Sequence, residues 1–526
     1  MRSNRKLRTT SVIIALCLIG SGAAAQDGPV ATVEGGEVRG SVAEGVENFF
    51  GIPYAAPPVD DLRWAPPAPV SGWNGDRDAT AYGPACPQGA GLDAERTTEE
   101  DCLFVNVQRP EGATEGDALP VVVLIHGGGW VTGSGNNENL NAMVRENDIV
   151  GVTMNYRLGN LGFLAHPALA DEEDDVGNYG LLDQVAALEW VRDNIAAFGG
   201  DPDQVTIGGE SAGGGSTCQI LAAPAADGLY NRAFMMSTLC LAIPQDEAEA
   251  EGEMIAAGLG CEDDTASCLR DLSVDALIDA EGIFNRPVKG TPFLPRSGWE
   301  ELQDGTLTDV PVLIGANRNE GRSFLTDWPS RSVPTFDGPA YEAYVRDTFD
   351  ADADAVLAVY PYPDDPTRYS GTYLVAEVMM KNFTGPGGLS ACKTNEITEL
   401  LARTSDVWAY EFAPEGGPGW FEVPGYVWGA GHAVELPYLI PDRGNFANNA
   451  SALSDAHLEL AQTMLAQWGA FVRGGDPNVE STPDWPTYTA DGGPVMQLKE
   501  GGRSRVIPTV ALRAAHNCDF WESLGD

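Results

Sequence analysis

Short runs of β-branched and aromatic residues recur along the chain, and they restrict it to folds built on a buried sheet. The runs are bounded by turn residues and lie at 121–125, 150–154, 205–207, 312–314 and 407–412. Strands that are apolar throughout are typical of parallel sheets covered on both faces. Between the second and third runs, residues 181–195 carry apolar side chains at helical spacing, and Gly199-Gly200 supplies a stop. The pattern predicts strand–helix–strand units and an α/β fold with a large, mostly parallel sheet.

The third run leads directly into a Gly-x-Ser-x-Gly sequence. Gly209, Glu210, Ser211, Ala212 and Gly213 follow the strand without an intervening loop. A serine on a tight strand-to-helix turn projects its hydroxyl from the sheet, and flanking glycines avoid clashes with neighbouring backbone. This arrangement is the nucleophile elbow of the α/β-hydrolase fold, and it predicts Ser211 as a nucleophile.

A glycine-rich segment follows the first run, upstream of the elbow, as His126-Gly127-Gly128-Gly129-Trp130. Acyl transfer develops negative charge on a carbonyl oxygen, so backbone N–H groups must converge on that oxygen. Consecutive glycines allow such a close approach. The sequence predicts an oxyanion hole formed by the N–H groups of Gly128, Gly129 and Ala212.

The serine needs a general base, and the chain has only five histidines. His126 belongs to the glycine loop, His166 precedes the nucleophile, and His457 lies in a helical pattern. His432 lies in a Gly-Ala-Gly-His loop after the run at 407–412, whereas His516 is close to a cysteine near the chain end. His432 is therefore the predicted base, with His516 as the alternative.

The orienting acid should come between nucleophile and histidine, at the carboxyl end of a strand. Glu320 follows the run at 312–314 in an Asn-Glu-Gly turn and fits this position. Asp406 is the weaker alternative, because it begins a strand. The predicted triad is Ser211, His432 and Glu320.

The amino-terminal residues predict export from the cytoplasm. Four basic residues precede an apolar run at 12–19, and small residues end at Ala25. This is the pattern of a cleaved secretory signal peptide over residues 1–25, which places the mature protein in the periplasm or outside the cell. The apolar run is too short for a membrane anchor. Its removal leaves 27 basic and 77 acidic side chains, a net charge of −50 that excludes nucleic acid as a partner.

The cysteines are consistent with an oxidising compartment, because eight of them remain after signal removal. Spacing suggests that Cys86 pairs with Cys102 and Cys261 with Cys268. Sequence alone does not decide how the other four, Cys218, Cys240, Cys392 and Cys518, are paired. No metal-ligand pattern is found, and the predicted chemistry requires no cofactor.

With these residues in view, the chain resembles the type B carboxylesterases, the family of cholinesterases and bacterial nitrobenzyl esterases. The resemblance extends over nearly all of the mature sequence. It rests on the segments Phe50-Gly-Ile-Pro-Tyr-Ala55, Glu100-Asp-Cys-Leu103, Asn155-Tyr-Arg-Leu-Gly159, Gly177-Asn-Tyr-Gly-Leu-Leu-Asp-Gln184, Phe198-Gly-Gly-Asp-Pro202, Leu436-Pro-Tyr438 and Trp485-Pro486.

The resemblance implies a single α/β-hydrolase domain over residues 26–526, with helical insertions around an active-site gorge. It implies the same triad, a Glu-Gly turn at Glu320 and a Gly-x-x-His loop at His432. It further implies that Glu210 lies near the imidazolium and that Ser237 supports Glu320. By the same resemblance, Cys218 pairs with Cys240 and Cys392 with Cys518.

Together these features predict a secreted hydrolase of small to medium, apolar or aromatic carboxylic esters. An amidase or peptidase with the same triad and a non-catalytic binding protein are the alternatives. Cholinesterase activity is disfavoured, because the segment 86–102 has no tryptophan to bind a quaternary ammonium group. Oligomeric state is not readable from the sequence. Expected pocket walls, at 270–300 and 325–390 and the adjoining Phe324, contain the aromatic residues Phe284, Phe293, Trp299, Phe324, Trp328 and Phe383.

Overall fold

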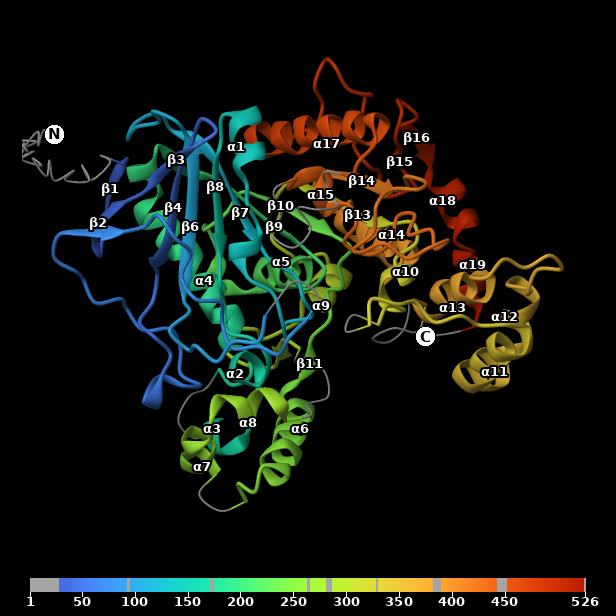
Figure 1. Ribbon diagram of the computed structural model, residues 1–526, viewed down its shortest axis with the longest axis horizontal. Helices are drawn as coiled ribbons and strands as arrows, with labels where there is room; N and C mark the ends of the chain where they lie inside the picture. Colours follow the sequence, from blue (N-terminus) through green and yellow to red (C-terminus); the bar gives the residue numbers. More distant parts are fainter. Residues whose placement is uncertain are drawn as a thin grey trace, which may run out of the picture.

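The chain is built around one eleven-stranded mixed sheet (Figure 1). The computed structural model describes residues 28–91, 95–170, 175–262, 265–280, 286–327, 330–381, 389–441 and 452–524. The expected signal peptide at 1–25 and the aromatic residues Phe284, Trp328 and Phe383 lie outside these ranges.

The sheet has its parallel strands in the centre and antiparallel strands at both edges. In spatial order the strands are β16 (Arg505–Pro508), β15 (Pro494–Leu498), β14 (Val407–Phe412), β13 (Val312–Asn317), β10 (Arg232–Met236), β9 (Gly200–Glu210), β7 (Leu119–Ile125), β8 (Val150–Met154), β6 (Phe104–Pro110), β4 (Val46–Pro53) and β3 (Ser41–Ala43). All neighbours from β15 to β8 pair in parallel. The carboxyl ends of these strands therefore meet along one edge of the sheet.

All five runs expected to form strands do so, and those at 150–154 and 407–412 have the expected bounds as β8 and β14. Two small additional sheets contain the strands β1 (Val30–Val33), β2 (Gly36–Arg39) and β5 (Asp76–Asp78), and the strands β11 (Ile243–Pro244) and β12 (Val288–Lys289).

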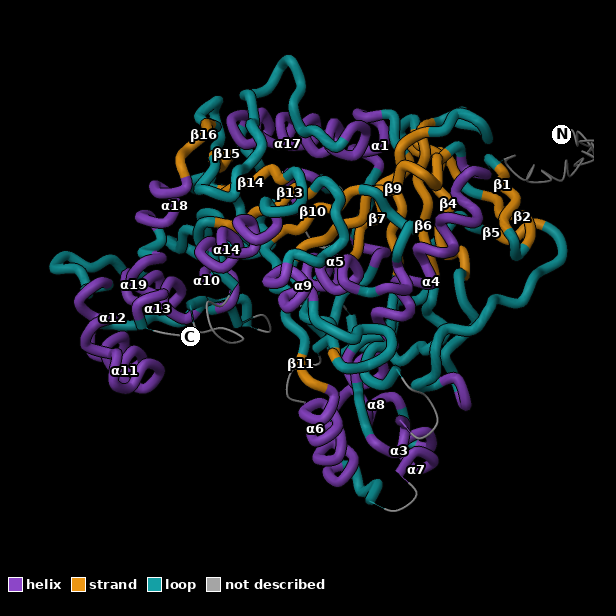
Figure 2. The backbone as a smooth tube through the Cα atoms, turned by 180° about the vertical axis from the view of Figure 1, so that it is seen from behind, coloured by secondary structure: helices purple, strands orange, loops and turns teal. Residues whose placement is uncertain are grey.

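Helices cover both faces of the sheet, as Figures 1 and 2 show. One layer contains α4 (Tyr179–Asn194), α5 (Ala212–Ala222), α9 (Gly298–Asp304) and α14 (Ala391–Leu401), and the other contains α1 (Asn141–Asn147), α15 (Leu436–Leu439) and α17 (Asp455–Gly474). In β7, Val121, Val123 and Ile125 pack into the core beneath α4 and α5, while Val122 and Leu124 pack against α1 and α17. Side chains alternate along a strand, so one apolar run supplies both cores.

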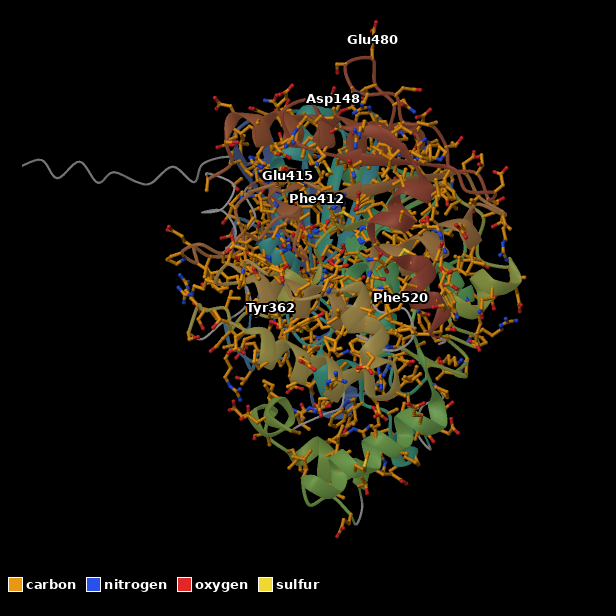
Figure 3. All side chains as sticks on the ribbon, turned by 90° about the vertical axis from the view of Figure 1, so that its right-hand side faces the viewer. Asp148, Tyr362, Phe412, Glu415, Glu480 and Phe520 are labelled. Carbon is orange, nitrogen blue, oxygen red and sulfur yellow. A yellow bond between two sulfur atoms is a disulfide. The ribbon has the colours of Figure 1, made fainter. Side chains whose placement is uncertain are left out.

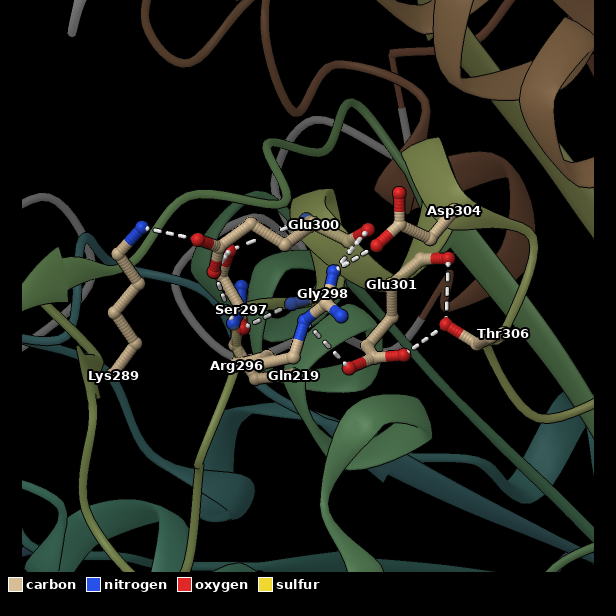
Figure 4. Close-up of polar contacts among 9 residues, drawn as sticks. All are labelled: Gln219, Lys289, Arg296, Ser297, Gly298, Glu300, Glu301, Asp304 and Thr306. Carbon is tan, nitrogen blue, oxygen red and sulfur yellow. Dashed lines mark hydrogen bonds and ion pairs between the residues drawn. The ribbon is translucent and has the colours of Figure 1, made fainter.

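Hydrogen bonds hold α9 against the elbow helix α5 (Figure 4). Ser297 caps α9 in a capping box with Glu300, which also receives Lys289 Nζ at 2.8 Å. At the same helix end, the Gly298 N–H donates to Gln219 Oε1 of α5 over 2.9 Å. A capping interaction of this kind contributes about 1 kcal/mol to the stability of a helix. These contacts fix the start of α9 beside the helix that follows Ser211.

Two helical insertions project from the sheet, each with its own small core. The lower one in Figure 1 contains α2 (Gly159–Phe163), α3 (Pro167–Ala170), α6 (Gln245–Gly258), α7 (Thr265–Asp271) and α8 (Val274–Asp279). The right-hand one contains α10 (Gly321–Phe324), α11 (Gly338–Phe349), α12 (Ala353–Val359), α13 (Ser370–Met379) and, beyond α18 (Thr509–Ala515), α19 (Cys518–Ser523). Within the described ranges no helix has the length and apolar character needed to cross a bilayer.

Four disulfides staple loops and helix ends. They join Cys86 to Cys102, Cys218 to Cys240, Cys261 to Cys268 and Cys392 to Cys518. The pairing is the one that spacing and family resemblance suggested. The last bond closes 126 residues and ties the chain end, through α19, to α14.

Candidate active site

Ser211 forms the turn between β9 and α5. Its backbone has φ 57° and ψ −121°, a conformation that is uncommon for any residue other than glycine. The turn is held by a hydrogen bond from the Ser211 N–H to Met236 O, at 2.9 Å. A Cβ atom at Gly209 or Gly213 would lie 2.3 Å or 2.0 Å from Ile125 O. Both glycines of the motif are therefore needed, because any side chain would push the elbow away from β7.

The glycine loop after β7 lies against this elbow. A Cβ atom on Gly127 would approach the Ser211 Cβ to 3.3 Å. Gly128 and Gly129 have φ values of +110° and +63°, and a Cβ on Gly128 would lie 2.1 Å from Thr132 O. In the described part of the chain, no protein acceptor takes the backbone N–H of Gly128 or Gly129. These two donors are thus available to a ligand beside Ser211.

Glu320 occupies the turn after β13 and is only 4% exposed. Its Oε1 accepts hydrogen bonds from Ser237 Oγ at 2.6 Å and from the Asn317 N–H at 2.7 Å. Its Oε2 lies 2.7 Å from His432 Nδ1. Two donors therefore fix one carboxylate oxygen, which leaves the other for the imidazole.

His432 is buried in a loop that is itself held by the Glu320 turn. The backbone N–H of His432 donates to Glu320 O at 3.2 Å. The backbone carbonyl oxygen of His432 accepts from Ser323 Oγ at 2.9 Å and from Trp420 Nε1 at 3.1 Å. The Phe324 ring lies 4.7 Å from the imidazole, centre to centre. Nδ1 faces Glu320, and Nε2 lies 3.1 Å from Glu210 Oε1.

The imidazole is surrounded by carboxylates, and this determines its charge. Burial lowers the pKa of His432, but the negative charges of Glu210 and Glu320, together with the hydrogen bond that the imidazole donates to Glu320, outweigh this effect. The net effect raises the pKa of His432 to about 9. The two carboxylates that face Nδ1 and Nε2 therefore favour the protonated form of the imidazole.

The structure brings Glu210, Ser237, Glu320 and His432 into contact, with Ser211 next to Glu210 in the chain. Among the described residues, Ser211 and His432 share no hydrogen bond, because Nε2 faces Glu210. The alternative base His516 pairs with Glu411 at 2.7 Å. The alternative acid Asp406 is exposed at the start of β14, on the opposite edge of the sheet from Glu320.

Comparisons with known proteins identify the family and the fold. The family model described as the carboxylesterase family matches residues 27–521. The chain belongs to this family. It is 33% identical to the para-nitrobenzyl esterase of Bacillus subtilis (strain 168), over 87% of this chain and 92% of that protein. It is 34% identical to the fumonisin B1 esterase of Sphingopyxis macrogoltabida, over 89% and 87%.

Solved structures extend the relationship to three dimensions. A thermophilic PNB esterase superimposes with a TM-score of 0.77 at 30% identity, covering 93% of this chain and 99% of that one. A carboxylesterase of Geobacillus stearothermophilus superimposes with a TM-score of 0.75 at 31% identity, covering 92% and 99%. The protein is a carboxylesterase of the α/β-hydrolase fold.

Sequence reasoning missed one further carboxylate of the esterase site, that of Glu435. Its side chain is fully buried and accepts a hydrogen bond from Asn317 Nδ2. Burial, together with the charges of Glu210 and Glu320, raises the pKa of Glu435 to about 8. The only sequence signal was an acid directly before the apolar Leu436-Pro437-Tyr438, which does not distinguish it among 77 acidic residues.

The aromatic residues expected in the pocket walls separate into two groups. Phe324 packs on the His432 imidazole. Phe293 is buried in the core around the sheet, and Trp299 packs on that core with Lys393 Nζ 4.1 Å from its ring centre. Of the three described aromatics, only Phe324 contacts the triad residues.

Proposed function

We propose that this carboxylesterase hydrolyses small to medium, apolar or aromatic esters through an acyl-enzyme formed on Ser211. The 2.7 Å contact between Glu320 Oε2 and His432 Nδ1, beside the elbow that carries Ser211, is the observation that supports it most directly. With Nδ1–H bound to a carboxylate, Nε2 is the nitrogen that takes a proton.

In the first step His432 loses its Nε2 proton to solvent, which leaves the neutral imidazole. The Ser211 hydroxyl then turns toward Nε2, and its proton passes to this nitrogen as the serine oxygen attacks the ester carbonyl. Nε2 must therefore release Glu210, which lies 3.1 Å away. Catalytic hydrogen bonds are often loose before substrate binds. The imidazolium formed is stabilised by Glu320 on one nitrogen and by nearby Glu210. It then returns the proton to the leaving alcohol, and water hydrolyses the acyl-enzyme by the same route.

The N–H groups of Gly128, Gly129 and Ala212 would receive the oxyanion of each tetrahedral intermediate. The positive φ values of the two glycines and their adjacency to the elbow support this role. Each such donor contributes about 3 kcal/mol to transition-state stabilisation. The Phe324 ring beside His432 supports a preference for apolar or aromatic groups at this end of the site.

A chromogenic ester provides the test. With p-nitrophenyl butyrate, the wild-type protein should release a burst of p-nitrophenol equal to the enzyme concentration, followed by steady turnover. Ser211→Ala should remove the burst and reduce turnover by several orders of magnitude, with an unchanged circular dichroism spectrum. Full turnover by the folded Ser211→Ala variant would reject the mechanism. Faster turnover of the matched anilide would instead indicate an amidase.

We further propose that residues 26–526 form one exported domain and that residues 1–25 are a cleaved signal peptide. Four disulfides and the basic, apolar and small-residue pattern of residues 2–25 support export. Amino-terminal sequencing of protein from the periplasm or medium should begin at Gln26. A mature protein that keeps residues 1–25 would contradict this proposal.

A further inference from the structure

A cavity of about 540 Å³ lies at the carboxyl ends of β14 and β15. Glu411 and Gln497 line it from these strands, and Arg505 and Ile507 line it from β16. Glu415, another lining residue, is labelled in Figure 3. Its described lining includes no member of the Ser211 triad. We call it the arginine cavity.

The cavity carries an excess of positive charge in a strongly acidic protein. Four cations, Arg318, Arg322, Lys499 and Arg505, line it, against the two carboxylates Glu411 and Glu415. The whole chain has a formal net charge of −46. The protein as a whole repels anions, so a local cluster of positively charged side chains requires a local explanation.

Both carboxylates of the cavity are already paired with other groups. Glu411 Oε1 lies 2.7 Å from His516 Nε2, and Oε2 accepts from Gln497 Nε2 at 2.7 Å and lies 3.4 Å from Arg318. Glu415 Oε1 is 2.8 Å from Lys499 Nζ. The two acids are thus engaged by His516, Gln497, Arg318 and Lys499 rather than by the remaining arginines.

Arg322 and Arg505 remain without a carboxylate partner among the described residues. Arg322 donates to Val427 O at 3.0 Å, and its guanidinium lies 4.5 Å from the Tyr373 ring centre. Burial lowers the pKa of Arg322, although an arginine stays charged at any physiological pH. The charge of Glu377 acts on this partly buried cation without forming an ion pair with it, so an anionic ligand that bonds to the guanidinium directly would stabilise it further.

We propose that the arginine cavity binds a small oxyanion with two or more negative charges, such as a dicarboxylate or inorganic phosphate, held by Arg322 and Arg505. Guanidinium groups match carboxylate and phosphate oxygens through paired N–H donors. The volume of the cavity accommodates such an anion together with several waters. Arg318 and Lys499 add positive charge to the same wall.

The site shares a wall with the turn that holds the triad. Asn319 and Gly429 both line the cavity. Asn319 precedes Glu320, and its N–H donates to Ala430 O, in the His432 loop, at 2.8 Å. A bound anion therefore contacts the segment that fixes the distance between Glu320 and His432, and occupancy should stabilise that segment.

Isothermal titration of the full-length Ser211→Ala protein with succinate, citrate and phosphate tests the proposal, with ionic strength held constant by sodium chloride. Because this variant is inactive under the proposed mechanism, the outcome does not depend on that mechanism. We expect saturable 1:1 binding of at least one of the three anions. Binding of the carboxylates alone or of phosphate alone identifies the ligand class, and either result supports the site.

Arginine variants then locate the binding. Arg505→Gln and Arg322→Gln should each weaken binding at least tenfold, and Arg505→Lys should restore part of it. Arg505 is exposed, so the Arg505→Gln protein should fold and can test the site even if the Arg322→Gln protein does not fold. Arg346→Gln is the matched control, because Arg346 is an exposed arginine on α11. Absence of saturable binding, or equal binding by Arg505→Gln and wild type, would overturn the proposal.

Discussion

Replacement of Glu320 by glutamine tests the proposed mechanism at one atom. Ser237 Oγ and the Asn317 N–H both donate to Glu320 Oε1, at 2.6 Å and 2.7 Å. In Glu320→Gln these two donors select the amide oxygen for that position. The amide NH₂ must then face His432 Nδ1, where Oε2 now lies at 2.7 Å.

An amide donor at Nδ1 forces this nitrogen to accept, so the imidazole proton moves to Nε2. The tautomer is then wrong for removing the Ser211 proton. The equivalent change in a serine protease triad lowers kcat about 10⁴-fold, which corresponds to roughly 5.5 kcal/mol of transition-state stabilisation. We expect a loss of the same order here, measured as kcat on p-nitrophenyl butyrate.

Glu435→Gln is the matched control, because Glu435 is equally buried but bonds to Asn317 rather than to the imidazole. It should retain activity within about tenfold, which corresponds to a change of at most about 1.36 kcal/mol in the activation barrier. A Glu320→Gln variant with more than a tenth of wild-type kcat, or a Glu435→Gln variant as inactive as Glu320→Gln, would refute the reasoning. Thermal melts of both proteins exclude misfolding.

The remaining predictions concern pH, packing and charge. The base acts as neutral imidazole, so kcat/KM should rise with pH through the His432 pKa of about 9, and a profile already flat above pH 6.5 would contradict this. Gly213→Ala should lower stability by at least 1–3 kcal/mol in urea denaturation, because the new Cβ would lie 2.0 Å from Ile125 O. Gly258→Ala, with nothing within 4 Å, should be neutral or stabilising, and equal stability losses in the two glycine variants would contradict the packing argument. Asp183→Asn should lower the free energy of unfolding by about 3–5 kcal/mol, because it leaves the buried guanidinium of Arg157, 2.7 Å from the Asp183 carboxylate, without a counter-charge. Unchanged stability would argue against this ion pair.

Local patterns predicted the central strands, and they are also the basis of the proposed triad. Strands β8 and β14 are buried throughout and bounded by turn residues, so their ends were visible in the sequence. The elbow at Ser211 was predictable because both motif glycines are required by the close approach of Ile125 O. The glycines that this packing requires lie within the motif itself, although Ile125 is distant from them in the sequence.

Long-range neighbours were not predictable in the same way. Asn317 positions two carboxylates, Glu320 through its N–H and Glu435 through its side chain, and nothing in the sequence links these three residues. The roles of Phe293 and Phe324 differ because one faces the sheet core and the other the imidazole. Only the packing of separate segments decides such questions.

The most direct measurement of the central claim is the site and rate of labelling by a fluorophosphonate. This reagent phosphonylates a serine only when a neighbouring base activates it. Peptide mass spectrometry should find a single adduct, on Ser211, and His432→Gln should slow its formation by orders of magnitude. An adduct on another residue, or labelling of Ser211 at an unchanged rate in His432→Gln, would contradict the account.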